Sequence, residues 1–153
     1  MRISSTANVR NDLLQIIADK VPNFFGETTK RCGILVTSFS QGAHVLTTKS
    51  TYTVPANKRA ILLSTTCQIH NETAPTAIGG ASLEFTATLD GIGSGFINGV
   101  QLRSSDLSIC PVSAVVHNLP MEVGDSVKVD SNNGNTGGLV AFRGSATILE
   151  FDL

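Results

Sequence analysis

One stretch in the middle of the chain alternates strictly between apolar and polar residues and then turns. The apolar positions are Leu83, Phe85, Ala87 and Leu89, with serine, glutamate and threonine between them. Successive side chains of a β-strand point to opposite faces, so this alternation predicts a strand with one buried face. Asp90-Gly91 follows at once and is typical of a tight hairpin turn. The chain is therefore expected to build antiparallel sheet.

Short apolar or alternating segments of the same kind continue from residue 31 to the end of the chain. The expected strands are 34–39, 45–54, 58–70, 81–89, 96–103, 109–116, 126–130, 139–142 and 146–151. Turn residues separate them about every 10 residues, which is typical of a β-sandwich or jelly roll. Strands do not alternate with helical segments, which argues against a parallel α/β sheet. The predicted fold class is an all-β, antiparallel β-sandwich of jelly-roll type.

Several details of these strands are predicted from single residues. In 58–70, one face is expected to hold Ile61, Leu63, Cys67 and Ile69. Gly99 indicates a β-bulge, and Pro111 places the strand 109–116 at a sheet edge or a bulge. In 126–130, Val127 and Val129 are expected to be buried. Three segments are expected outside strands: Leu119-Pro120 begins a turn ended by Gly124-Asp125, residues 131–138 form a flexible loop, and Arg143-Gly144 divides the last two strands.

The first 30 residues differ from the rest and are expected to form a helical arm and linker, before a sandwich domain over 31–153. Residues 4–21 predict a helix that Pro22 ends. Four turns with one apolar stripe are marginal alone in water, so this helix must pack on its own sandwich or on a neighbouring subunit. The two phenylalanines of the linker either close the sandwich core or dock on another chain. The expected partner-binding residues are Val9, Leu13, Ile16, Ile17, Phe24 and Phe25.

The composition excludes several classes of partner. Charged residues make up 15% of the chain and the net charge is −1, with no basic block, so binding of nucleic acid through a basic face is not expected. No run approaches the roughly 18 apolar residues that span a bilayer. The start of the chain lacks the apolar core of a signal peptide, so folding in a cytoplasm is expected. The low charge suits large protein–protein contacts, although threonine-rich sheets are also common for reasons of β-propensity alone.

The cysteines and histidines are too few and too scattered to predict a cofactor or metal. Cys32, Cys67 and Cys110 are odd in number and form no CxxC pair, so no disulfide framework is expected, and Cys32 and Cys67 are interpreted as small buried apolar residues. The three histidines are His44, His70 and His117. They lie far apart in sequence, without the short spacing of a metal site. His70, at a strand end, is interpreted as a solvent-facing or loop-capping residue.

Three other candidate sites fail on their spacing. Cys110, His117 and Asp106 contain the residue types of a nucleophile set, but Cys110 and His117 are seven apart and fall on opposite faces of a regular strand. The glycine-rich segment 91–95 lacks the following helix that a phosphate loop requires. Asp130, Asn132 and Asn135 do not follow the order of an EF-hand loop. The sequence therefore predicts no enzyme, no cofactor and no metal.

Two motifs resemble a known group of proteins. Residues 52–60 (YTVPANKRA) lead into a long strand, and residues 119–129 (LPMEVGDSVKV) precede a Gly/Asn segment and a final apolar strand. Together they resemble small β-sandwich virion proteins of tailed bacteriophages, including capsid decoration (cement) proteins. The later motif is also similar to the end of jelly-roll heads of the tumour-necrosis-factor and complement-C1q type. The resemblance implies a trimer whose N-terminal arm contacts neighbouring subunits, and it supplies no specific binding residue.

The resulting functional hypothesis is a structural virion protein that decorates and stabilises a phage head. Its expected partners are the major capsid protein or other virion proteins and further copies of itself, in a virion assembled in the cytoplasm of a bacterial host. The alternative hypothesis is a carbohydrate- or receptor-binding head of a phage tail or fibre, with its site in the loops 71–80, 90–95 and 131–138. The single tyrosine and the absence of tryptophan weaken that alternative.

Overall fold

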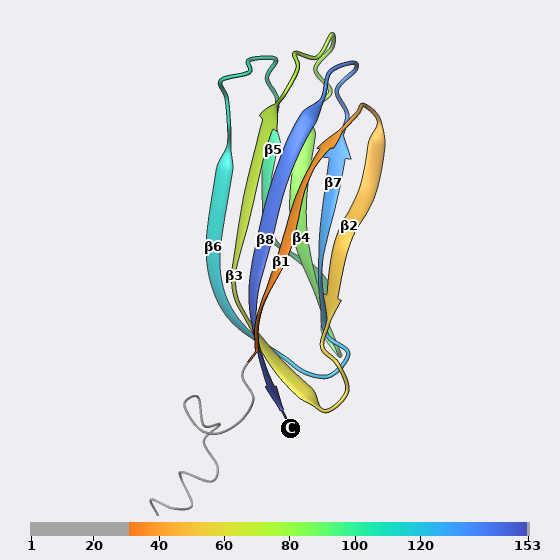
Figure 1. Ribbon diagram of the computed structural model, residues 1–153. Coiled ribbons are helices and arrows are strands. Elements are labelled where there is room, and N and C mark those ends of the chain that lie inside the picture. The colour runs from red at the N-terminus through yellow and green to blue at the C-terminus, as the bar shows by residue number, and fades with distance from the viewer. Residues whose placement is uncertain (1–30, 153) are drawn as a thin grey trace, which may run out of the picture.

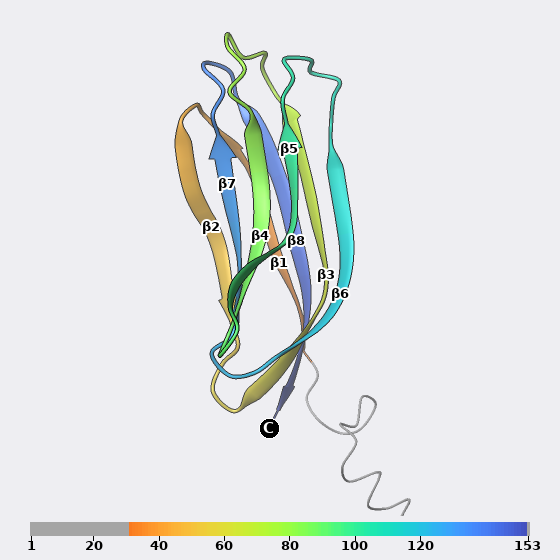
Figure 2. The same cartoon turned by 180° about the vertical axis from the view of Figure 1, so that it is seen from behind.

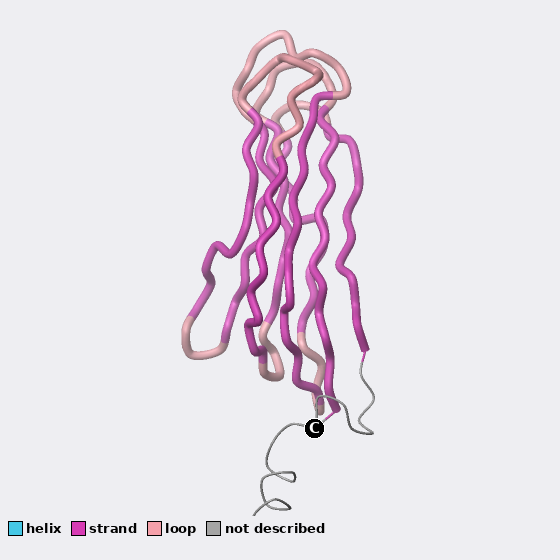
Figure 3. Tube along the Cα trace, turned by 90° about the vertical axis from the view of Figure 1, so that its left-hand side faces the viewer, coloured by secondary structure: helices cyan, strands magenta, loops and turns pink. Residues whose placement is uncertain are grey.

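The computed structural model describes residues 31–152, with side chains from residue 38 onward, and this part of the chain is built from eight strands (Figure 1). In chain order they are β1 (Arg31–Gln41), β2 (Val45–Thr53), β3 (Lys58–Asn71), β4 (Ala81–Leu89), β5 (Gly93–Leu102), β6 (Val112–Met121), β7 (Ser126–Asn133) and β8 (Val140–Asp152). The strands run roughly along one axis, and loops gather at the two ends (Figure 3). The helix expected over 4–21 lies outside the described residues.

The strands form two antiparallel four-stranded sheets. One sheet has the order β1-β8-β3-β6 and faces the viewer in Figure 1; the other has the order β2-β7-β4-β5 and faces the viewer in Figure 2. Consecutive strands mostly cross between the two sheets, and the last strand lies beside the first. This is the strand order of an eight-stranded jelly roll with its Greek-key connections. The predicted fold class, an antiparallel β-sandwich of jelly-roll type, is confirmed.

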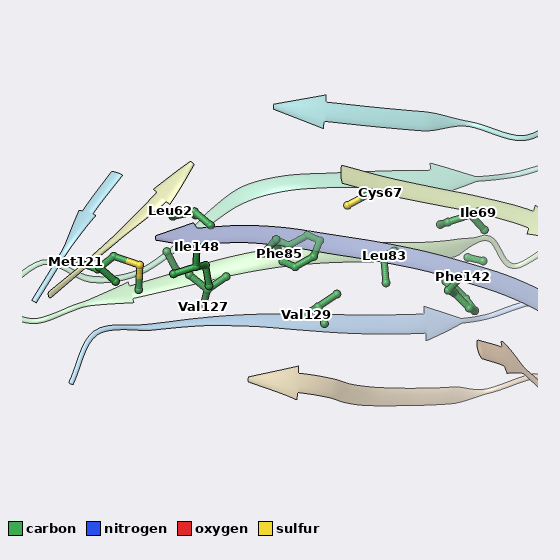
Figure 4. Close-up of a cluster of buried hydrophobic side chains, with 14 of the residues drawn as sticks. Leu62, Cys67, Ile69, Leu83, Phe85, Met121, Val127, Val129, Phe142 and Ile148 are labelled. Atoms are coloured by element: carbon green, nitrogen blue, oxygen red, sulfur yellow. The ribbon is translucent and has the colours of Figure 1, made fainter. Parts of the chain in front are cut away.

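The core lies between the sheets and is made of alternate residues from both (Figure 4). In β4, Leu83 and Phe85 are fully buried, and Leu89 packs against the core from its margin, as the alternation predicts. Val127 and Val129 of β7 are fully buried as well. The largest fully buried side chains are Phe85, Phe142, Leu62, Ile69, Leu83, Leu102, Met121, Ile148, Val54, Val127, Val129 and Val140.

Of the four residues predicted to share the buried face of β3, two are buried and two are not, because the strand contains a bulge. Cys67 and Ile69 are buried, but Ile61 and Leu63 are only partly buried, and Leu62 takes the core position instead. The pairing of β3 with β8 shifts between Leu62 and Ser64. One extra residue in a strand reverses the inward and outward positions beyond it. No local sequence signal marks that extra residue.

Four further details differ from the sequence prediction. The bulge of β5 falls at Ile97 rather than at Gly99, since Asn98 and Phe96 pair with consecutive residues of β4. Leu119 and Pro120 pair with β3 inside β6 instead of beginning a turn. The segment 131–133, expected in a flexible loop, completes β7. Pro120 is tolerated because β6 is an edge strand, where a missing N–H costs little. Of the two positions predicted for this strand, an edge or a bulge, the structure shows the edge.

The fourth difference is that β8 runs without a break through Arg143-Gly144. Gly144 lies in the core, where a side-chain carbon added to it would sit 3.3 Å from Leu83 and from the ring of Phe85. Gly144 therefore does not form a turn. Its missing side chain leaves space for the ring of Phe85. A glycine inside a strand often marks such a close approach.

Candidate functional site

The loops divide into two groups at opposite ends of the sandwich. The lower end, where the C-terminus lies in Figure 1, holds the turns 54–57, 90–92 and 122–125. The upper end holds the segments 42–44, 72–80, 103–111 and 134–139. A functional site of this fold can therefore lie at either end or along the open sides of the sandwich.

Asp125 ties the three turns of the lower end together. Its carboxylate is buried and accepts hydrogen bonds from the backbone N–H of Asp90 (2.7 Å) and of Glu122 (2.8 Å). The backbone N–H of Val54 donates to the carbonyl of Asp125 (2.8 Å), and that of Gly124 donates to the carbonyl of Val54 (3.0 Å). Gly124 has a φ of +90°, which a glycine adopts without strain. The two motifs of the sequence resemblance therefore meet at one structural joint.

The surface around this joint mixes apolar side chains with charged ones, among them the exposed ion pair of Arg59 and Glu122. A shallow pocket lies between the turns 90–92 and 122–125, and Asp90 is the one ionisable residue among those that line it. Ile92 is 81% exposed, and Val123 is 45% exposed. The glycine-rich segment forms the turn and the start of β5 and does not precede a helix. This end of the sandwich thus presents two exposed apolar side chains, Ile92 and Val123, beside turns that hydrogen bonds to Asp125 hold together.

The upper end is held by a buried network of amide side chains. The Gln41 amide donates to the carbonyl of Val45, and the Ser131 hydroxyl donates to Gln41 Oε1 (2.7 Å). The Asn133 amide donates to the carbonyl of Gln41 (2.9 Å). Asn135 Oδ1 accepts from the N–H groups of two consecutive glycines, Gly79 (3.1 Å) and Gly80 (2.9 Å). The segment 131–138 is therefore largely a support for its neighbours, with Asn133 and Asn135 fully buried.

The residues considered for calcium do not converge. Asp130 accepts from Thr48 (2.6 Å) and forms an ion pair with Lys128 (2.9 Å), while Asn132 is exposed on β7 and Asn135 is buried at the upper end. Among residues 31–152, no group of three or more His, Cys, Asp or Glu side chains lies close enough to hold a metal ion.

The three residues that the sequence analysis rejected as a nucleophile set also stay apart in the structure, because each has a different partner. Cys110 is exposed and accepts from the Gln68 amide (2.9 Å), and Asp106 accepts from the backbone and hydroxyl of Ser108 (both 2.8 Å). These two bonds to Ser108 hold the pKa of the Asp106 carboxyl below its ordinary value. His117 lies against Thr65 instead (2.7 Å). The arrangement provides no activated thiol.

His117 belongs to a polar network on the side of the sandwich between β5 and β6. The Asn98 amide donates to Thr65 Oγ1 (3.0 Å), Thr65 Oγ1 lies 2.7 Å from His117 Nε2, and the Ser113 hydroxyl donates to Asn98 Oδ1 (2.6 Å). Partial burial lowers the pKa of His117 from its ordinary value, because burial disfavours the charged imidazolium. The network joins β3, β5 and β6 and closes this side of the core.

The other cysteines and histidines occupy unremarkable positions. Cys67 is fully buried as predicted, and burial, followed by the nearby Glu84 charge, raises the pKa of its thiol to about 12. The side chain of Cys32 is not among those described. His70 lies half-buried near the end of β3, and His44 has a φ of +58° in the turn after β1, 3.4 Å from Thr136 Oγ1.

Apolar side chains that face solvent are the surface feature that sequence reasoning missed. They belong to turns, strand ends and edge strands. Among the described residues, the large apolar residues that are exposed are Val45, Leu46, Ile78, Ile92, Phe96, Leu107, Ile109, Val112, Val116, Val123 and Leu139. An inward or outward orientation is decided by the pairing partner of each residue, which a single sequence does not report.

The six residues expected to bind a partner, Val9, Leu13, Ile16, Ile17, Phe24 and Phe25, lie outside the described residues. Their binding role stays a prediction. The described chain enters β1 at the lower end, at Arg31, which pairs with Glu150 of β8.

No helix in residues 31–152 is long and apolar enough to cross a membrane.

Comparison with solved structures finds similar β-sandwiches at low sequence identity. Latent PorU from Porphyromonas gingivalis aligns over 88% of this chain with 15% identity and a TM-score of 0.49. The VP2 subviral particle of infectious bursal disease virus aligns over 79% with 12% identity and a TM-score of 0.39. A protein of the Bacillus endospore appendages, described as disulfide-linked pili, aligns over 84% with 10% identity and a TM-score of 0.34.

These similarities differ in how much of the other protein they cover. The aligned part of this chain spans 14% of the PorU chain, 32% of the VP2 chain and 92% of the appendage protein. No protein-family model and no curated protein sequence matches the chain. The strand order and the shared core define the class of fold, a single jelly-roll β-sandwich.

Proposed function

We propose that this chain is a non-enzymatic structural protein of a virion, which decorates and stabilises the head of a tailed bacteriophage. The observation that carries the proposal is the group of exposed apolar side chains on a rigid, charge-poor jelly roll, such as Ile92 and Val123 at the lower end. Ile92 and Val123 line one hollow at the lower end, where a partner can bury both side chains together.

The sequence resemblance supports the same proposal. The motifs 52–60 and 119–129 come together at the joint around Asp125, and they therefore hold the lower end in one shape. The chain enters β1 at that end, so the segment 1–30 joins the sandwich at the same end as the exposed Ile92 and Val123 surface. In the proposed function, the arm and this surface bind the major capsid protein together, and each large apolar side chain contributes about 1.5–3 kcal/mol when fully buried. Repeated contacts over a lattice multiply such modest affinities.

Co-sedimentation with phage heads that lack the protein tests the proposal. The heads are those assembled from the major capsid protein of the genome that encodes this chain. The full chain is expected to sediment with the heads, whereas deletion of residues 1–22 and the Ile92→Lys substitution each weaken binding. Leu46→Lys is the matched control, because Leu46 is similarly exposed (77%) but lies near the upper end. Heads that fail to retain the intact chain at saturating concentration contradict the proposal.

A second candidate function, carbohydrate binding, is favoured by one observation. Phe96 is 66% exposed on the outer face of the β2-β7-β4-β5 sheet, and its ring lies over Gly99, where a side-chain carbon would sit 2.8 Å from it. Thr88 and Ser94, which form a hydrogen-bonded pair (2.6 Å), lie two positions along the same two strands from Phe96 and its partner Thr86. An exposed ring with polar neighbours is a surface on which a sugar stacks.

A glycan array tests this alternative and separates it from the first. Clear hits that Phe96→Ala abolishes and Ile92→Ala leaves intact favour carbohydrate binding. An array without hits, together with retention on heads, favours the virion proposal.

A further inference from the structure

The outer edge of β6 is open and apolar. Within the described residues β6 pairs only with β3, so the N–H and C=O groups along its other edge have no strand partner. Val112 is 64% exposed and Val116 is 75% exposed, and Ala114 between them is exposed as well. The strand has no lysine, arginine, aspartate or glutamate. Long, apolar, uncharged edges invite pairing with another strand, and natural proteins usually protect them.

The edges of the opposite sheet carry protections along their length, whereas β6 has its register shift and its proline, Pro120, only beyond Val116. β2 has a register shift between Thr48 and Ser50, and Lys49 lies there with its ammonium 4.3 Å from the centre of the Phe39 ring. β5 is kinked by the bulge at Ile97 and opens with Gly93 and Gly95. Bulges and edge lysines are devices that prevent strands from adding to a sheet. The straight segment 112–116 of β6 has neither.

The order of residues in this segment makes it complementary to itself. In an antiparallel pair of two copies centred on Ala114, Val112 of one copy lies opposite Val116 of the other, and the two Ala114 residues face each other. Each exposed residue of one copy, Val112, Ala114 or Val116, then lies opposite an apolar residue of the other copy. The contact buries no charged side chain. The segment ends at His117 and Asn118, where the pairing with β3 shifts and Asn118 has a φ of +53°, so longer or slipped registers meet an irregular backbone.

We propose that β6 pairs with β6 of a second copy about a twofold axis at Ala114. Two β1-β8-β3-β6 sheets then join into one continuous eight-stranded sheet. A second copy fits this edge better than a strand with the usual edge charges, because lysine or glutamate opposite Val112 or Val116 loses hydration without gaining a partner. The proposal goes beyond head decoration, since this contact uses neither the segment 1–30 nor the lower end of the sandwich.

The mass of the full chain in solution is the first test. Sedimentation equilibrium at up to about 100 µM chain, a range that detects weak dimers, is expected to show a reversible monomer–dimer equilibrium. Val116→Lys is expected to weaken dimerisation at least about tenfold, because it places a lysine in the paired edge. Leu46→Lys is the control, since Leu46 is as exposed (77%) but lies on β2. A strictly monomeric chain, or a dimer or trimer that Val116→Lys leaves unchanged, overturns the proposal.

Disulfide trapping tests the register. In a Cys110→Ser background, Ala114→Cys is expected to give a cross-linked dimer under mild oxidation, because opposite Cα atoms in an antiparallel pair lie about 5 Å apart, within reach of a disulfide. Val116→Cys in the same background is the control. In the proposed register the two copies of residue 116 are offset by about 13 Å along the strands, too far to bridge. Cross-linking by both variants, or by neither, overturns the register.

The two proposals fail separately. Heads that bind the Val116→Lys variant as well as they bind the parent chain leave head decoration standing, whatever the outcome for the dimer. A dimer that Val116→Lys disrupts stands even when no head binds the chain.

Discussion

Asp125 is the residue on which the lower end of the sandwich depends. Its buried carboxylate receives two backbone N–H groups from two different turns, and its own carbonyl receives a third from Val54. A carboxylate that accepts hydrogen bonds is worth more than a neutral acceptor, and a buried N–H left without an acceptor costs about 1–3 kcal/mol. The Gly-Asp pair that resembles virion proteins in the sequence is therefore explained by a structural role.

Replacing Asp125 is expected to destabilise the fold strongly. Asp125→Ala leaves the N–H groups of Asp90 and Glu122 without their acceptors, and we expect the free energy of unfolding to fall by about 2–4 kcal/mol. Asp125→Asn keeps one acceptor oxygen and should cost less. Urea denaturation followed by circular dichroism measures the change. Asp106→Asn, at an exposed loop position, is the control, and an equal loss in both variants contradicts the assigned role.

His117 is expected to make stability depend on pH. Its pKa is lowered in the folded chain by partial burial, whereas in the unfolded chain it returns to its ordinary value of about 6.5. Below that pH the unfolded chain binds a proton that the folded chain binds less readily, so stability is lost as the pH falls. We expect the free energy of unfolding to drop between about pH 7.5 and pH 5.5, the range around the unfolded pKa.

A variant separates this contribution from that of other groups. His117→Gln should flatten the pH dependence of the unfolding free energy. A parent-like slope in His117→Gln would show that another group is responsible.

At the scale of elements, the two sheets are joined by side-chain hydrogen bonds between their strands as well as by the apolar core. Tyr52 of β2 donates its phenol O–H to Glu150 of β8 (2.8 Å), across the gap between the sheets. Burial, followed by the hydrogen bond to Glu150 and its charge, raises the pKa of Tyr52 well above its ordinary value. On the other side of the sandwich the Asn98 network makes a comparable connection between β3 and β5.

Tyr52 gives a direct optical test of this connection. It is the only tyrosine and the chain has no tryptophan, so the phenolate absorbance reports this residue alone. In the folded chain we expect no ionisation at pH 10, whereas in urea the residue should titrate near its ordinary value of about 10. The free energy of unfolding falls as the pH rises through the unfolded value. Glu150→Gln should bring the folded titration to lower pH, and an unchanged curve would argue against the contact.

The elements also show which sequence signals are reliable. The alternation in β4 and the buried pair in β7 depend on neighbours two residues apart, and the sequence predicts them correctly. The buried face of β3 and the position of the bulge in β5 depend on the pairing with a partner strand, which has one residue fewer at the bulge. The sequence does not report this pairing, and both predictions are wrong. The sequence pattern also predicts a bulge at Gly99 and a break at Gly144, whereas in the structure these glycines make room for the rings of Phe96 and Phe85.

At the scale of the whole molecule, the eight strands share one core that both sheets line. The division of the chain into an arm over 1–30 and a sandwich over 31–153 remains a prediction of the sequence. We expect residues 31–153 alone to unfold in one cooperative transition, because all the strands and the entire core of the described chain belong to this segment.

Coincident unfolding curves from circular dichroism and from Tyr52 absorbance measure that cooperativity. The full chain is the reference for the free energy of unfolding. Broad or separate transitions in residues 31–153 would show that the sandwich requires the arm in order to fold.

The sequence by itself determined the fold class, most strand positions, the choice between an edge and a bulge for β6 and the burial of the β4 and β7 core residues. These properties follow from the period-two pattern, from turn residues and from proline, all of which act over a few neighbouring positions. Only the tertiary structure decided the strand order, the joint at Asp125, the amide network at the upper end and the open edge of β6. Each of these depends on which distant segments pair. Arg31 and Glu150, for example, pair across 119 positions, and the packing of the whole sandwich rather than any local pattern sets such pairing.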